Sequence, residues 1–251
     1  MRGSAWGLLL LLVGSASVSA SEWLRWTTPS LPDVPAFCCA TKDGAHAQLA
    51  ACKLDGGNAV YGRFDGAPRS GHAQVYARYD EAVLTDVRIF DGACGVAADS
   101  PVRDLGALDT DASLSRLLAP VPGSQRAVRD RLVAVALHPG ARASTWLQQR
   151  SRDGANEERR DAWFWLGQRL GARVEPLVRA ALPTARGSLR EHLVFVLSQM
   201  PEPAGVDALI ALVEDRTVDR GLRGRALFWL AQSDDDRAYA WLDRRLDSAE
   251  P

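Results

Sequence analysis

Two neighbouring thiols, Cys38 and Cys39, are the residues of this sequence with the most distinctive chemistry. They could capture a metal ion or respond to oxidants, but the chain has no Cys-x-x-Cys motif and no histidine placed to complete a tetrahedral site. The other cysteines, Cys52 and Cys94, also lie in the N-terminal half. A bond between neighbours would close a strained ring, so we expect Cys38 and Cys39 each to pair with one of Cys52 and Cys94 in structural disulfides. Thiol or metal sensing through Cys38-Cys39 is the alternative.

The histidines and short motifs give no sign of an active site. No His-Glu-x-x-His motif or other paired-ligand spacing occurs among His46, His72, His138 and His192. The sequence also lacks a Gly-x-Ser-x-Gly elbow, a phosphate-binding loop and a dinucleotide fingerprint. We therefore expect no catalytic residue, no cofactor and no metal, and a protein that is not an enzyme.

The first twenty residues have the layout of a secretory signal. Arg2 supplies a positive charge, residues 5–13 are apolar, and Val18-Ser19-Ala20 offers small residues for cleavage after Ala20. An apolar run of about ten residues is too short for a membrane span, which needs about twenty. Residues 1–20 are thus predicted to be a signal peptide. After its removal we expect an exported protein of the bacterial periplasm, without membrane insertion.

Residues 21–120 are predicted to form a small β-rich domain that carries the four cysteines. Apolar and polar residues alternate over 74–79 and again over 83–90, on either side of a break at Asp80-Glu81, which is typical of an antiparallel hairpin. Residues 59–61 have the character of another strand. Asp109 or Asp111 can cap a short helix over residues 114–118. Residues 121–125, in a Pro-Gly-Ser-rich stretch, are interpreted as a linker.

A short phrase recurs in residues 126–251. Arg159, Phe164 and Gln168 return at the same mutual spacing as Arg190, Phe195 and Gln199, and then as Arg223, Phe228 and Gln232. A recurrence roughly thirty residues apart marks stacked supersecondary units. Each unit carries two apolar stripes at helical spacing, so each is predicted to be a pair of amphipathic helices that hide their stripes by stacking. With a weaker copy over residues 129–138, we expect about four pairs, the first packing on the β domain.

The Arg-x-x-x-x-Phe-x-Leu-x-Gln phrase and the segment Asp235-Asp236-Arg237-Ala238 resemble HEAT-like repeats. These are the helix-pair repeats of many scaffold proteins and of bacterial proteins grouped with bilin-lyase-type repeats. The resemblance covers roughly residues 126–250 and implies an α-solenoid used for protein contact. The expected fold class is therefore α+β, with a small disulfide-linked antiparallel β domain followed by an all-α HEAT-like solenoid.

The expected function is that of an exported scaffold that binds a protein partner through its helical-repeat surface. In solenoids of this type the second helices usually line the concave face, where the outward candidates are Arg173, Arg179, Asp207, Glu214, Tyr239 and Arg244. Their mixed charges and a net charge of −1 favour a protein partner over nucleic acid. A minority of the tryptophans in this half is expected to anchor the partner: Trp146, Trp163, Trp165, Trp229 and Trp241. Kinship to bilin-lyase-type repeats implies the alternative of an enzyme or lyase-like chaperone with a site at the domain junction.

Overall fold

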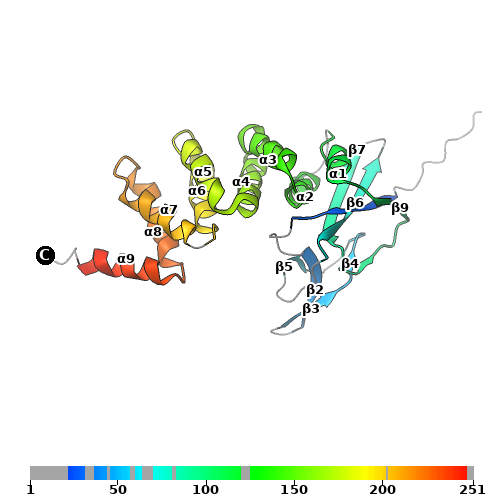
Figure 1. Ribbon diagram of the computed structural model, residues 1–251, viewed down its shortest axis with the longest axis horizontal. Helices are drawn as coiled ribbons and strands as arrows, with labels where there is room; N and C mark the ends of the chain where they lie inside the picture. The colour runs from blue at the N-terminus through cyan, green and yellow to red at the C-terminus, as the bar shows by residue number, and fades with distance from the viewer. Residues whose placement is uncertain are drawn as a thin grey trace, which may run out of the picture.

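The computed structural model describes residues 22–31, 37–43, 46–56, 60–63, 70–80, 83–119, 125–201 and 203–247. The predicted signal peptide and almost all of the predicted linker lie outside these residues. The described chain starts with strands and continues with helices (Figure 1). This confirms the coarse prediction of a β-rich N-terminal part with two disulfides, followed by a helical part.

The largest sheet has the strand order β7-β6-β1-β9. Its members are β1 (Trp23–Pro29), β6 (His72–Asp80), β7 (Val83–Asp91) and β9 (Val102–Ala107). β6 and β7 form the predicted antiparallel hairpin, with Ala73 opposite Asp91. The prediction of a purely antiparallel domain is wrong, because β9 pairs parallel with β1. A parallel pairing needs a crossover, and residues 92–101 provide it by carrying the chain from the end of β7 back to the start of β9.

Two smaller sheets hold the cysteines. The first has the order β3-β2-β5 and is antiparallel, with β2 (Phe37–Asp43), β3 (His46–Ala50) and β5 (Val60–Arg63), the last overlapping the strand predicted near residue 60. The second pairs β4 (Cys52–Lys53) parallel with β8 (Val96–Ala97). A separate apolar cluster surrounds the cystines and is made of Trp23, Leu54, Tyr76 and Phe90.

The helices follow the strands. α1 (Thr110–Leu117) begins after Asp109, whose side chain accepts a hydrogen bond from the Ala112 N–H, so the predicted cap is confirmed. The later elements are α2 (Gln125–Ala136), α3 (Ala141–Asp153), α4 (Asn156–Leu170), the 3₁₀ helix η1 (Gly171–Val174), α5 (Glu175–Ala181), α6 (Gly187–Ser198), α7 (Ala204–Glu214), α8 (Arg220–Ala231) and α9 (Asp236–Asp247). None of the described helices is long and apolar enough to cross a bilayer.

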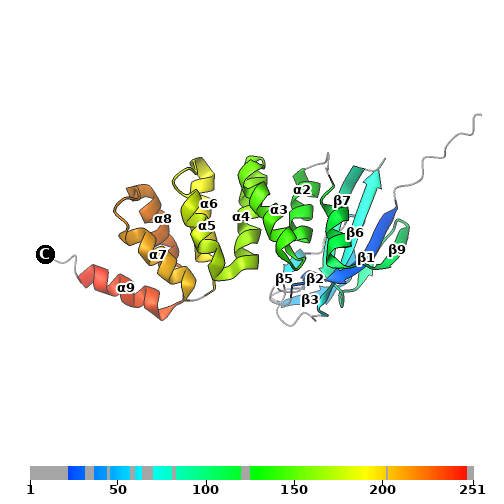
Figure 2. The same ribbon diagram turned by 45° about the horizontal axis from the view of Figure 1, so that its top comes forward.

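The helices from α2 to α9 run in consecutive pairs that extend away from the sheet in a row (Figure 2). The first helices of the pairs, α2, α4, α6 and α8, pack directly on one another in that order. Among the second helices, α3 packs on both α2 and α4, and α7 packs on both α6 and α8. In Figure 1 the row of first helices borders the recessed side of the molecule.

One continuous apolar core joins the sheet to the helices. It includes Trp26 of β1, Val87 of β7, Leu117 of α1 and Leu132 of α2, and it continues to Trp241 of α9. α2 packs directly on β7, so the first helix pair contacts the sheet. The two parts of the chain thus share buried apolar surface, which is the main stabilising contribution at their junction.

The start of α6 differs from what its sequence predicts. Ser188 and Glu191 have the spacing of a capping box, which predicts Ser188 as the N-cap residue. The N-cap residue is instead Arg186, two residues earlier, and it makes no side-chain cap. Gly187 has a φ of 55°, a left-handed value that suits glycine at the sharp turn into the helix. At the start of α9 the Asp235 carboxylate accepts a hydrogen bond from the Arg237 N–H at 2.8 Å.

Candidate functional site

The four cysteines form two disulfides, Cys38–Cys94 and Cys39–Cys52, with Cα–Cα distances of 5.6 and 5.1 Å. This pairing is one of the two that the sequence left open, and no free cysteine is present. Within the described residues, no group of His, Cys, Asp and Glu side chains is arranged to hold a metal ion. In this oxidised form Cys38 and Cys39 therefore act as covalent ties of β2 to β4 and to the segment after β7.

His138 lies at the junction between the sheet and the helices. Its Nδ1 is 2.7 Å from the Ala134 carbonyl oxygen, and its Nε2 is 2.7 Å from the Ser113 hydroxyl. The Trp26 indole N–H donates to the same hydroxyl at 2.6 Å. Because a carbonyl only accepts, Nδ1 carries the proton and Nε2 accepts from Ser113. Burial lowers the pKa of His138 to about 4, so the ring is neutral at physiological pH.

The Ser113–His138 pair has the hydrogen bond of a serine nucleophile and its base, but its surroundings do not suit catalysis. Trp26, Ser113 and His138 are all 0% exposed, so a substrate has no access to the hydroxyl. In catalytic triads a carboxylate orients the histidine, whereas here a backbone carbonyl does so. The chain of hydrogen bonds instead ties β1, α1 and α2 together. Arg169 of α4 completes this junction by donating to the carbonyls of Ala136, His138 and Gly140 at the end of α2.

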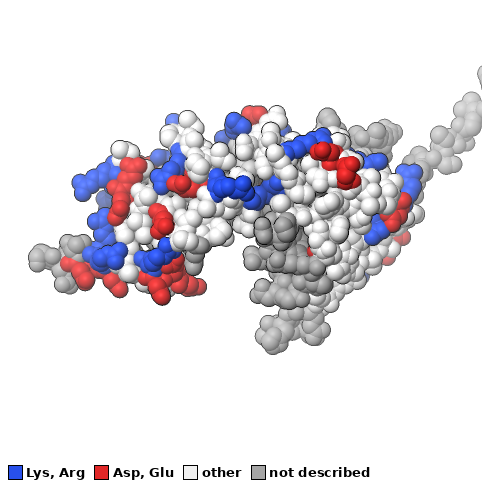
Figure 3. All heavy atoms as spheres, in the orientation of Figure 1, with Lys and Arg blue, Asp and Glu red and all other residues white. Residues whose placement is uncertain are grey.

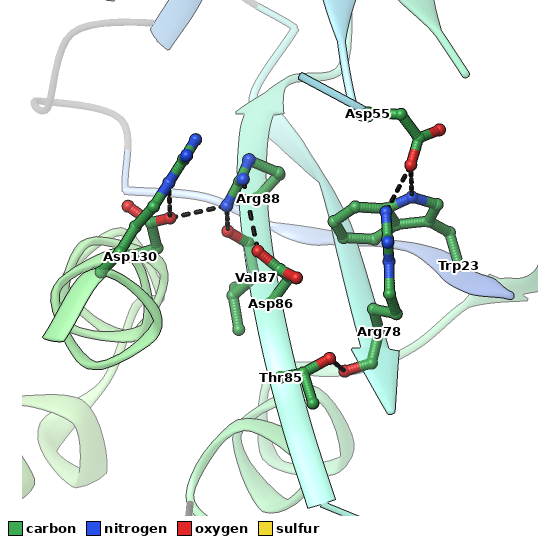
Figure 4. Close-up of polar contacts among 9 residues, drawn as sticks. Trp23, Asp55, Arg78, Thr85, Asp86, Val87, Arg88 and Asp130 are labelled. Carbon is green, nitrogen blue, oxygen red and sulfur yellow. Dashed lines mark hydrogen bonds and ion pairs between the residues drawn. The ribbon is translucent and has the colours of Figure 1, made fainter. Parts of the chain in front are cut away.

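A polar network surrounds the buried Trp23 (Figure 4). The Trp23 indole N–H donates to Asp55 at 3.0 Å, and Arg78 pairs with the same carboxylate while lying 4.3 Å from the Trp23 ring centroid. The backbone N–H groups of Asp99 and Ser100 donate to the other Asp55 oxygen at 3.0 and 2.9 Å. Burial alone would raise the pKa of Asp55, but these hydrogen bonds outweigh it and hold the pKa well below its usual range.

Replacing Asp55 by alanine should lower the free energy of unfolding by about 2 kcal/mol, because one indole and two backbone donors lose their acceptor and Arg78 loses its partner. Chemical unfolding followed by tryptophan fluorescence measures the effect. Asp99→Ala is the matched control, since Asp99 contributes to the network only its backbone N–H. Equal unfolding midpoints for the two variants would contradict a structural role of the Asp55 carboxylate.

Arg88 links the same sheet to α2. Its guanidinium donates to Asp130 at 2.6 Å and pairs with Asp86 at 3.4 Å (Figure 4). Burial raises the pKa of Asp130 even though Arg88 counteracts this effect. A cavity of about 110 Å³ lies beside this pair, and Lys53 and Arg126 are also part of its lining. Because Asp130 already neutralises part of the positive charge and the space is small, we interpret this cluster as a brace between sheet and helix.

Aromatic side chains form a ladder along the first helices of the pairs. The aromatic ladder consists of Phe37, Trp165, Phe164, Phe195, Trp229 and Phe228, with successive ring centroids 5.7, 5.3, 6.3, 5.2 and 5.1 Å apart. It begins on β2 and crosses α4, α6 and α8. Two repeated phenylalanines of the sequence phrase, Phe164 and Phe195, stack on each other, and Phe228 joins the ladder through Trp229. Each ring contact adds aromatic contact energy to area burial.

The ladder ends at an exposed apolar surface on the last two helices. Leu227 and Phe228 of α8 are 41% and 47% exposed, and Tyr239 and Leu246 of α9 are 48% and 69% exposed. Among the described residues, most of the large exposed apolar side chains lie on these two helices. Sequence reasoning selected Tyr239 and missed the other three. Of these three, only Phe228 carried a sequence signal, because it is the recurring phenylalanine of the repeated phrase.

The six predicted surface residues all have exposed side chains on η1 or on second helices, namely Arg173, Arg179, Asp207, Glu214, Tyr239 and Arg244. Three of them have partners within the chain. Arg179 pairs with Glu175, Asp207 lies 3.5 Å from Arg237, and Glu214 accepts from the Trp241 indole N–H at 3.0 Å.

The tryptophans of the helical part are core residues. Trp163, Trp165 and Trp241 are buried, and Trp146 and Trp229 are half-buried, so the expected exposed tryptophan anchor is absent from this described set. Positive and negative side chains are interspersed over the helix pairs (Figure 3). No family model and no curated protein matches this chain. The working surface therefore has to be identified from its own exposed side chains.

Proposed function

We propose that this protein is an exported HEAT-like helical-repeat scaffold, an α-solenoid joined to a disulfide-linked β domain, that binds a protein partner through its helix pairs. The observation that carries the proposal is the exposed apolar surface of α8 and α9: Leu227, Phe228, Tyr239 and Leu246. Single exposed apolar residues are ordinary, but several on two helices that pack together are typical of a partner-binding surface. The two disulfides support a non-cytoplasmic location.

The exposure of these side chains departs from the way helix pairs bury apolar groups. Each helix pair hides its apolar stripes against neighbouring pairs, so large apolar side chains that stay exposed on a pair are available to a partner. Among the described helices, α8 and α9 keep such side chains in water. Aromatic and aliphatic groups of this kind, when desolvated at the centre of an interface, contribute most of its binding energy.

Affinity capture from envelope extracts with the mature chain as bait tests the proposal. The double variant Leu227→Glu with Phe228→Glu should reduce recovery of the captured partner by at least about tenfold, because two charges would enter an apolar interface. Thr145→Glu with Gln149→Glu adds the same charges to exposed positions of α3 and should leave recovery unchanged. The proposal is contradicted if the α8 and α3 double variants recover the partner equally well. If the variant Arg179→Glu with Arg244→Glu then loses the partner, the interface lies on the second helices and not on α8.

A further inference from the structure

A groove of about 380 Å³ is lined by residues of α3, α4, α5 and α6 and of the turn between α5 and α6. Its apolar lining is Trp163, Leu177, Ala180, Ala181, Ala185 and Leu189. Its polar lining is Gln148, Ser151, Arg152, Arg159 and Thr184. A concave apolar surface with a few convergent polar groups is the usual form of a ligand site.

The residues at this groove differ from those of other repeats at two positions, and one of the differences concerns the partner of a cation. In the next pair, the equivalent residue is Arg190 of α6. It forms an ion pair with Asp219, the N-cap residue of α8, which is the first helix of the following pair. The corresponding N-cap residue for Arg159 is Arg186, which has the same charge as Arg159. Trp163 also departs from the pattern, since the equivalent positions hold the smaller Val194 and Leu227. Residues that serve only the repeat fold recur at equivalent positions. Two positions of one groove that differ from the other repeats therefore indicate a local role.

The electrostatics of the groove favour an anionic occupant. Arg159 donates from Nε to the Ser151 carbonyl at 3.3 Å, and Arg152 does the same to the Gln148 carbonyl at 3.2 Å. Among the described residues, neither guanidinium has a carboxylate within ion-pair distance, and none of the residues lining the groove is acidic. The terminal N–H groups of both side chains are therefore suited to bind a carboxylate, which guanidinium groups hold in a bidentate way.

We propose that this groove binds the C-terminal end of the protein partner, with its carboxylate on Arg152 and Arg159 and its last apolar side chain against Trp163. The inference rests on the proposed function and names the chemistry of the partner. The Gln148 amide can donate to and accept from a peptide backbone, and the Thr184 hydroxyl, which itself donates to the Ala181 carbonyl, can accept from a backbone N–H. A free carboxylate next to an apolar side chain is found at the end of any chain that terminates in an aliphatic residue.

Isothermal titration of the full mature chain with acetyl-Gly-Ser-Gly-Ala-Val-Leu tests the inference. The peptide with a free carboxylate should bind at least about tenfold more tightly than its C-terminal amide, because only the acid forms charge-assisted hydrogen bonds. Arg152→Gln with Arg159→Gln should abolish this difference. Arg152→Gln alone changes an exposed side chain and should reduce it partly, which covers the case of a poorly folded double variant. Arg216→Gln, an exposed change away from the groove, should keep it.

Equal binding of acid and amide, or no binding of either, would overturn the inference. Binding of decanoate with the same dependence on Arg152 and Arg159, but not of the peptide, would assign the groove to an acyl carboxylate and also overturn it. The Leu227→Glu/Phe228→Glu variant separates this result from the proposed function. That variant should lose the partner in the affinity-capture experiment and still bind the peptide in the titration. The proposed function and the peptide-binding groove can therefore each fail without the other.

Discussion

Removal of the Cys38–Cys94 disulfide is expected to lower the free energy of unfolding by about 4 kcal/mol, against about 3 kcal/mol for Cys39–Cys52. The difference follows from the chain that each bond closes, 56 residues of sequence separation in the first case and 13 in the second. The longer closed loop removes more conformational freedom from the unfolded chain. Urea unfolding of the pairs Cys38→Ala/Cys94→Ala and Cys39→Ala/Cys52→Ala measures both values.

Reduction of the wild-type chain supplies the control for this comparison. A reductant should lower its unfolding midpoint, and it should lower the midpoint of each paired variant only by the contribution of the bond that remains. If both variants keep the wild-type midpoint, the disulfides do not stabilise the native state. If the short loop has the larger effect, loss of packing around the buried cystines exceeds the chain-entropy difference.

Acidification from pH 6.5 to about 4 is expected to cost about 3 kcal/mol of stability through His138 alone. The unfolded chain binds a proton near the ordinary histidine pKa of 6.5, whereas burial lowers the folded-state pKa to about 4. The unfolded state therefore binds more protons within this window. The stabilising contribution is complete above pH 6.5 and is lost as the pH falls toward 4.

Comparison of wild type with His138→Gln isolates this effect. The variant is less stable at neutral pH, since glutamine replaces a fitted ring, but its stability should change much less between pH 7.5 and 4.5. Carboxylates that titrate in the same range contribute equally to both chains and cancel in the difference. His72→Gln, a change at an exposed histidine, should retain the wild-type pH dependence. Parallel stability curves for wild type and His138→Gln would contradict the expected role of burial.

Local patterns in the sequence predicted the elements in which buried and exposed residues recur at a regular spacing. The β6–β7 hairpin alternates strictly, and the helix pairs repeat their stripes, so both could be predicted from periodicity. β1 could not, because its register shifts between Arg25 and Thr27 and its buried residues do not alternate. The cysteine chemistry limited the disulfides to two pairings, but only the three-dimensional arrangement of β2, β4 and β8 selects one.

The candidate surfaces depend on contacts between distant residues, which periodicity does not contain. The Ser113–His138–Trp26 chain joins three elements that are far apart in sequence. The repeated phenylalanines were evident, but their stacking into the aromatic ladder depends on how closely the first helices approach. Arg159 has no carboxylate partner among the described residues. This could be recognised only from the helix boundaries, which place Arg186 at the N-cap of α6, whereas Asp219 stands at the N-cap of α8.

The core that runs without interruption from the sheet into α2 anchors the row of described helices to the sheet at its first pair. Small tilts between successive pairs add up with distance from that anchor. The angle between the sheet and α8 or α9 can therefore vary more than the angle between the sheet and α4. Such a row can present the apolar side chains of α8 and α9 to partners of different shape without a change in the cystine-bearing sheets.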